Sequence, residues 1–158
     1  MATQYTAGLS AGQILTAATM NQIGAAWETW TPALTAFTTN PTLGSGSVQN
    51  GRYGRINKTV YGHGQIVFGT SGTNAGSGFY YVSIPVTAQG SGTLCGTWFA
   101  YDASTDTVAI GSLVLDSTTR MILYRNGVGG GTFLVASGVP WAWGATDIIR
   151  VTFQYEAA

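Results

Sequence analysis

The chain has 158 residues, enough for one domain whose core folds without disulfides or a structural metal. Charged residues are 8% of the sequence, against roughly 25% in an ordinary soluble domain, and six basic and six acidic side chains cancel. This composition excludes the clustered basic surface that a nucleic-acid partner requires. A weakly charged surface is also poorly protected against association, which predicts a homo-oligomer.

Membrane insertion and export are not expected from the sequence either. No apolar run approaches the roughly 20 residues of a membrane-spanning helix. The first residues, MATQYTAGLSAG, lack the basic and apolar regions of a signal peptide. Cys95 is the only cysteine, so a disulfide framework and a cysteine-based zinc site are excluded, and we expect Cys95 in the core.

The N-terminal part carries the one helical pattern. Residues 1 to about 12 are expected to be extended and polar, and a short helix is predicted over Thr16–Trp27. Thr16 can cap this helix, and Met20, Ile23 and Trp27 recur at the spacing of one apolar stripe. A helix this short needs something to pack against. We therefore divide the chain into an arm with a short helix, 1–27, and a β-domain, 28–158.

From Trp27 onward the pattern is that of β-strands, with turn residues roughly every ten positions, as in a β-sandwich. The predicted strands are Thr29–Phe37, Ser47–Ile56, Thr59–Gly69, Phe79–Pro85, Thr93–Tyr101, Val108–Leu115, Arg120–Arg125, Thr132–Ala136 and Ile148–Glu156. Asn57-Lys58 fits a two-residue hairpin loop. No helical pattern alternates with the strands, so the predicted fold is an all-β, antiparallel, jelly-roll-like sandwich.

Two strands carry informative patterns. In Ile148–Glu156 the apolar side chains alternate with polar ones, as in a strand with one buried face. In Thr59–Gly69, Gly62 and Gly64 share a face with apolar residues. They are predicted to leave room for a large side chain of a neighbouring strand, such as Trp98 or Tyr81.

The sequence between Leu15 and Phe68 resembles small minor tail and tail-fibre proteins of phages, especially those of actinobacteria. In those proteins LTAA-type residues precede a W-x-x-[WY]-x-P segment, an N-P-T-L-G-x-G turn and a G-x-Y-x-[RK]-x-[GN]-K-T-V hairpin. The matching residues here are Leu15–Asn21, Trp27, Trp30, Pro32, Asn40–Gly44, Gly51, Tyr53, Arg55 and Asn57–Val60. Thr19 stands where the family has an acidic residue.

The resemblance implies a structural protein on the virion surface, made in the host cytoplasm, and not an enzyme. It implies a homotrimer of the tail whose arm attaches to other virion proteins, with Leu15, Met20, Ile23 and Trp27 as the attachment residues. Such a protein can contact host-surface glycans. The alternative is a capsid decoration protein or head fibre that binds and stabilises the shell.

Catalytic and metal sites are weakly indicated. His63 is the only histidine and has no acidic neighbour in sequence, so a catalytic triad is not expected. Asp102 and Asp106 flank a DASTD loop, and turn chemistry explains them better than calcium does. The expected catalytic residues, metals and cofactors are therefore none.

Aromatic residues are the better indication of a binding site. Trp141 and Trp143 follow Pro140 and would share a face of an extended segment, where indoles can hold sugar rings. The alternative, which we favour, is that both tryptophans fill the core or a subunit interface.

Overall fold

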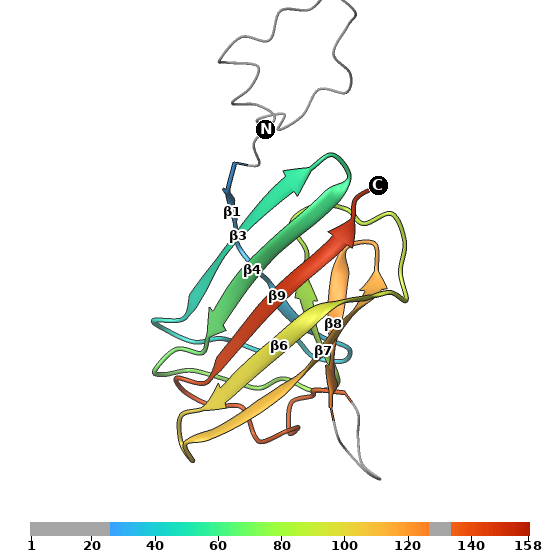
Figure 1. The fold of residues 1–158 in the computed structure, drawn as a ribbon. Coiled ribbons are helices and arrows are strands. Elements are labelled where there is room, and N and C mark those ends of the chain that lie inside the picture. Colours follow the sequence, from blue (N-terminus) through green and yellow to red (C-terminus); the bar gives the residue numbers. More distant parts are fainter. Residues whose placement is uncertain (1–25, 127–133) are drawn as a thin grey trace, which may run out of the picture.

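The computed structural model describes residues 26–126 and 134–158. These residues form nine strands and no helix: β1 Glu28–Trp30, β2 Leu34–Ala36, β3 Val48–Ile56, β4 Thr59–Val67, β5 Tyr80–Ser83, β6 Leu94–Asp102, β7 Thr107–Ser117, β8 Arg120–Arg125 and β9 Ile148–Glu156. All neighbouring strands are antiparallel, in the order β1-β3-β4-β9-β6-β7-β8-β5-β2 (Figure 1). The prediction of an all-β antiparallel fold is confirmed, but the predicted jelly-roll-like sandwich is not, because all nine strands belong to one sheet.

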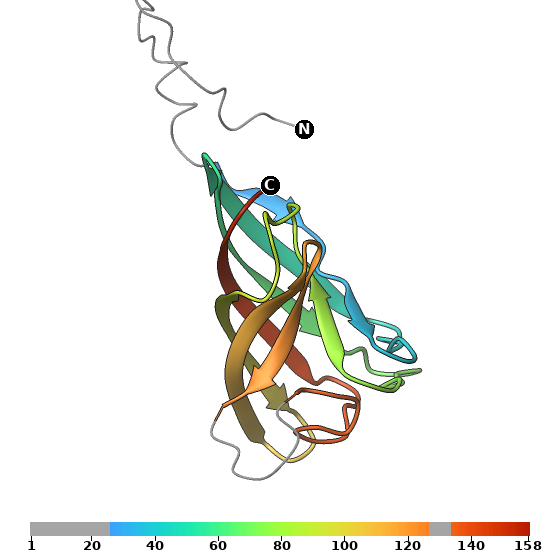
Figure 2. The same ribbon diagram turned by 90° about the vertical axis from the view of Figure 1, so that its right-hand side faces the viewer.

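The strands belong to one sheet that curls into a half-barrel, as the side view shows (Figure 2). Its two edge strands, β1 and β2, are consecutive in the chain and are joined by residues 31–33. The predicted strand Thr29–Phe37 is therefore divided. Its first part pairs with β3 and its second part with β5. Pro32 lies between the two parts, where a residue without an N–H cannot continue a ladder.

Most other strand predictions agree with the structure to within two residues, and the loop at Asn57-Lys58 joins β3 to β4 as predicted. The prediction of a strand over Thr132–Ala136 is wrong for its described part, because Leu134 and Ala136 form isolated bridges. The predicted helix lies outside the described residues except for its end. Trp27 belongs to no helix and directly precedes β1.

The core lies inside the curled sheet. It contains Trp98, Tyr80, Phe68 and Leu113, each at most 2% exposed, and Cys95, as predicted. The alternation predicted for β9 is confirmed, because Ile149, Val151, Phe153 and Tyr155 are buried while the residues between them face outward.

The two glycines of β4 do leave room for large side chains, but not for Trp98 or Tyr81 as predicted. A Cβ on Gly64 would meet the indole of Trp30, and one on Gly62 would meet the ring of Phe153. Gly64 pairs with Gly51 of β3, and the Trp30 indole lies over this glycine pair. Trp30 also donates from Nε1 to the carbonyl of His63 at 3.3 Å and packs edge-to-face on Phe153.

This packing predicts a coupled effect of Gly51 and Trp30. Gly51→Ala should lower the free energy of unfolding by about 1–3 kcal/mol, because the new methyl group would displace the Trp30 indole packed over Gly51. In a Trp30→Ala background the same substitution should cost less than about 0.5 kcal/mol, since no indole remains to be displaced. Equal costs in both backgrounds, measured by urea unfolding, would contradict this packing.

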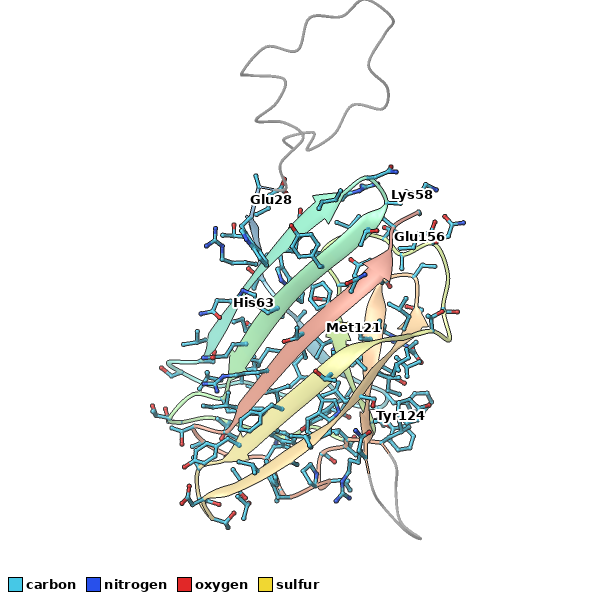
Figure 3. The ribbon with its side chains drawn as sticks, viewed as in Figure 1. Glu28, Lys58, His63, Met121, Tyr124 and Glu156 are labelled. Carbon is cyan, nitrogen blue, oxygen red and sulfur yellow. The ribbon has the colours of Figure 1, made fainter. Side chains whose placement is uncertain are left out.

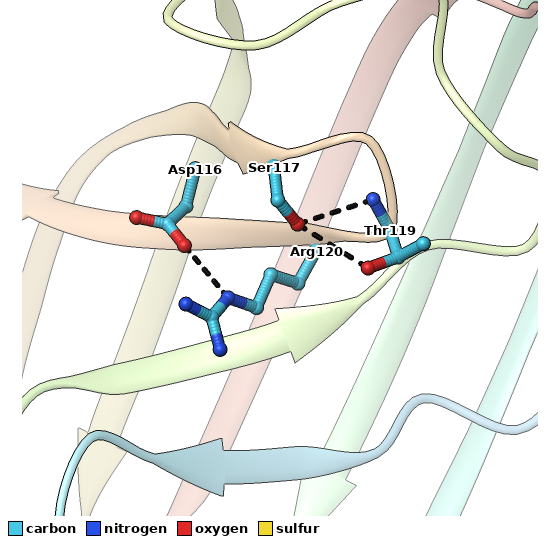
Figure 4. A network of polar contacts seen from close by, with 4 residues as sticks. All are labelled: Asp116, Ser117, Thr119 and Arg120. Carbon is cyan, nitrogen blue, oxygen red and sulfur yellow. Dashed lines mark hydrogen bonds and ion pairs between the residues drawn. The ribbon is translucent and has the colours of Figure 1, made fainter.

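Polar contacts also close the β7–β8 turn. Arg120 forms an ion pair with Asp116 at 2.6 Å, and the Ser117 hydroxyl accepts from the backbone N–H of Thr119 (Figure 4). The Arg120 guanidinium lies 3.8 Å from the centre of the Tyr81 ring. Tyr81 points to the outside of the sheet, opposite Ile122, yet it is 4% exposed because Arg120 and its neighbours cover it.

Candidate functional site

The outer face of β4, β9 and β6 holds an open cleft of about 380 Å³. It is called here the outer cleft, and its outward-facing side chains are Trp27, Tyr61, His63, Thr97, Thr152 and Gln154. The register places His63 opposite Thr152, and Thr152 opposite Thr97, so the three form one row across three strands. Figure 3 shows His63 on β4, in the front layer of the sheet.

Aromatic rings form one wall of the outer cleft. Trp27 is 44% exposed and packs edge-to-face on Tyr61, with ring centres 5.4 Å apart. The His63 ring lies 5.6 Å from the Trp27 ring. The guanidinium of Arg52, which pairs with His63 across β3 and β4, lies 5.9 Å from the Trp27 ring centre. An exposed indole held by three neighbours is a pre-positioned apolar surface.

Three polar side chains, those of Thr97, Thr152 and Gln154, lie on the floor of the outer cleft. Within the described residues, the side chains of Thr97, Thr152 and Gln154 form no hydrogen bond to the protein. All three are exposed, so their donors and acceptors face solvent. The floor can therefore exchange hydrogen bonds to water for hydrogen bonds to a ligand.

The outer cleft has none of the groups that acid–base or nucleophilic catalysis requires beyond His63 itself. Among the described residues that line it, none is acidic. Cys95 reaches the cleft, but burial raises the pKa of its thiol to about 12, so it stays protonated and unreactive. An exposed indole beside hydroxyl and carboxamide groups is an arrangement suited to binding.

The DASTD loop uses its carboxylate for turn chemistry, as predicted. Asp102 accepts hydrogen bonds from the N–H and hydroxyl groups of Ser104 and Thr105. The Ser104 hydroxyl is the largest of the effects that hold the pKa of Asp102 below its usual value. Asp106 accepts from the Tyr101 hydroxyl at 3.0 Å. No group of three or more metal-ligating side chains is gathered anywhere in residues 26–126 and 134–158.

Asp147 directly precedes β9 and is buried near Asp102. It links the loop after β6 to the loop before β9. Its two carboxylate oxygens accept from the backbone N–H groups of Ala103 and Gly144, at 3.0 and 2.9 Å. Burial raises its pKa, and the nearby charge of Asp102 acts in the same direction. The two carboxylates therefore organise the loops that contain Ala103–Thr105 and Gly144.

The two tryptophans proposed as a glycan site pack against each other, with ring centres 5.3 Å apart, but they differ in burial. Trp143 is 5% exposed, stacks on Phe68 and donates from Nε1 to the carbonyl of Ala136, so it belongs to the core. Trp141 is half-buried against it. In this arrangement Trp143 offers no ring face to a sugar, and the core alternative describes it correctly.

The predicted attachment residues are mostly outside the described part of the chain. Leu15, Met20 and Ile23 cannot be placed, and Trp27 lies in the outer cleft. Sequence reasoning missed Tyr61, Thr97 and Gln154 as site residues. The strand alternation placed Gln154 on the outward face, but it gave no indication that the three strands would bring these residues together.

A second apolar feature occupies the other end of the same outer face. It is called here the outer patch, and its residues are Val67, Phe99, Tyr101, Val108, Ile110 and Ile148. Tyr101 lies between Ile148 and Val108, and Phe99 pairs with Ile110. Val108 and Ile110 are 61% and 63% exposed, although isoleucine and valine are usually buried.

Within the described residues, no helix is long and apolar enough to cross a membrane. Comparison of the chain with family models, curated proteins and solved structures found no match.

Proposed function

We propose that this protein is a structural component of a phage virion, a surface-exposed homotrimer of the tail, and that it works by binding other protein chains without catalysis. The observation that carries the proposal is the outer patch. It is an apolar surface with two strongly exposed side chains, Val108 and Ile110, on a protein with few charges to keep copies apart. The resemblance of residues 15–68 to phage tail proteins supplies the assignment to the virion.

The size of the outer face fits a subunit interface. Strands lie about 4.8 Å apart and rise about 3.3 Å per residue. The outer face of four strands of β4, β9, β6 and β7 length therefore covers roughly 550 Å² in projection. A stable interface buries about 800 Å² on each partner, counted over the uneven side-chain surface. The two areas are of the same order.

A second apolar surface on the same chain is consistent with a cyclic trimer. In a cyclic trimer each chain contacts two neighbours through two different surfaces. Phe37 and Phe79 are 71% and 37% exposed and are joined by a backbone hydrogen bond of 3.0 Å that extends the β2–β5 pair by one residue. They lie on the far side of β8 from the outer patch in the strand order. The outer patch of one copy can therefore meet this aromatic pair of the next.

The oligomeric state tests this proposal. Light scattering after size exclusion should give three times the 16.4 kDa chain mass at micromolar concentration. Ile110→Asp should shift the mass to one chain, because a carboxylate buried in an apolar interface is strongly disfavoured. Ile56→Asp is the matched control and should remain trimeric, since Ile56 is 55% exposed but lies at the β3–β4 hairpin.

A monomeric wild-type chain would contradict the proposed interface, as would equal effects of the two aspartates. Circular dichroism of both variants would establish that they are folded. The copy number of the protein per particle, measured by mass spectrometry, distinguishes a position in the tail from one on the capsid. Tens of copies or fewer would support the tail. Hundreds would favour the alternative, a capsid decoration protein or head fibre.

A further inference from the structure

We propose that His63 makes the subunit interface sensitive to acid, so that the trimer separates into single chains when this side chain gains a proton. The inference rests on the proposed trimer, because it needs the outer face of β4, β9, β6 and β7 to be buried between copies. It goes beyond the structural role, since it states the condition under which the contact between copies is lost.

His63 is the group on this face whose charge ordinarily changes near neutral pH. It is the only histidine of the chain, and it is an exposed residue at the centre of β4. An imidazole gains a positive charge between about pH 7 and pH 5, whereas carboxyl groups ordinarily lose their charge only at lower pH. A cyclic trimer would therefore gain three charges at its interfaces over this range, one for each copy.

The charged side chains beside His63 on the neighbouring strands are both cations. Arg52 pairs with His63 across β3 and β4, and its guanidinium lies 5.9 Å from the Trp27 ring centre. Arg150 on β9 lies diagonally to His63, because its partner on β4 is Gln65, whose side-chain oxygen accepts from Arg150 Nε at 3.0 Å. Neither arginine forms an ion pair within the part of the chain that the structure describes. A proton on His63 would therefore add a third positive charge to two that no described carboxylate balances.

The remaining surroundings of His63 offer no compensating negative charge. Among the described residues that line the outer cleft around it, none is acidic. The acidic residue of β1, Glu28, already accepts a hydrogen bond from the Tyr53 hydroxyl. The surface of the next copy that is proposed to cover this face carries Phe37 and Phe79, which are uncharged. Burying a charge without a partner is strongly disfavoured, so the neutral imidazole suits the interface and the charged one does not.

The effect of pH on assembly therefore has one expected direction. In a single chain the charged imidazole would be hydrated, whereas in the trimer its charge would be opposed by burial and by the two arginines. Because the separated chains would bind more protons than the trimer, acid shifts the equilibrium towards single chains. The protein concentration at which half of the chains are assembled should rise at least roughly tenfold between pH 7.5 and pH 5.5.

The test is light scattering after size exclusion, with the full-length chain at pH 7.5 and pH 5.5, at equal salt and at several protein concentrations. The wild type should give three chain masses at pH 7.5 and move towards one chain mass at pH 5.5. His63→Gln, which cannot gain a charge, should remain trimeric at both pH values. His63→Lys, which is charged at both, should already be shifted towards one chain at pH 7.5.

The possible outcomes separate this inference from the proposed trimer. A wild-type trimer with the same mass at both pH values would overturn the inference and leave the trimer standing. Acid dissociation that His63→Gln shares would also overturn it, and would point to another group such as Asp147, whose pKa burial raises. A chain that is monomeric at both pH values would overturn the proposed trimer and this inference with it.

Circular dichroism at both pH values establishes that the separated chains are folded. The substitutions should leave the β signal unchanged, because His63 is exposed and does not belong to the core. Loss of the β signal at pH 5.5 would attribute dissociation to unfolding and would also overturn the inference.

Discussion

Gly111→Ala is expected to lower the free energy of unfolding by about 3 kcal/mol, among the largest effects of any single methyl group in this fold. A Cβ at this position of β7 would overlap the backbone carbonyl oxygen of Tyr124 on β8. It would also lie 2.6 Å from Nε1 of Trp98. Neither neighbour can yield easily, because the indole donates to that same carbonyl at 2.8 Å and is 2% exposed.

Chemical denaturation measures this effect, with the protein concentration held equal for all variants so that the contribution of subunit association stays comparable. Gly90→Ala is the matched control, since a Cβ there would meet nothing within 4 Å. It should change stability by less than about 0.5 kcal/mol. A similar, small effect of both substitutions would show that β7 and β8 do not approach the Trp98 ring as described.

Asp147→Asn is expected to destabilise the fold by about 1–3 kcal/mol although it keeps the shape of the side chain. The two carboxylate oxygens accept from two different backbone N–H groups, those of Ala103 and Gly144. A carboxamide has one oxygen, so its NH₂ group must face one of these donors and leave it without a partner. Urea unfolding measures the loss. Asp116→Asn, at a half-buried surface ion pair, is the control and should cost at most about 1 kcal/mol.

The stability difference between the wild type and Asp147→Asn should also depend on pH. Burial raises the pKa of Asp147 in the folded state above its unfolded value. The stability that comes from protonating this group is fully present below the unfolded pKa and is lost as pH rises through the folded pKa. The advantage of the wild type over Asp147→Asn should therefore be larger at about pH 4 than at about pH 7. A smaller advantage in acid would mean that the ionised form is the one the fold favours.

Strands β8 and β9 are the elements whose bounds follow most directly from the sequence. The bounds of both strands agree with the prediction, because turn residues flank each apolar run. In β9 the apolar side chains also alternate with polar ones, so one register buries them. The hairpin at Asn57-Lys58 was found for a similar local reason, since Asn57 adopts a positive φ of 53° that asparagine tolerates.

The packing of Trp30 over the glycine pair and the composition of the outer cleft could be seen only in the tertiary structure. Period-two alternation states which side chains point outward, but it does not state which strands become neighbours. The Trp30 indole covers Gly51 and Gly64 because β1 pairs with β3 and β3 with β4, in a register that aligns these three residues. Sequence reasoning found the space above Gly62 and Gly64 but assigned it to the wrong side chains.

By itself, the sequence determined the all-β class, most strand bounds and the burial of Cys95, because these depend on local conformational preference and on the removal of apolar side chains from water. The tertiary structure decided that one sheet curls into a half-barrel, and that Trp143 is buried while Trp27 is exposed. It also decided that Thr97, Thr152 and His63, far apart in the chain, form one row. The physical reason is that strand order follows from long-range pairing, which no short stretch of sequence encodes.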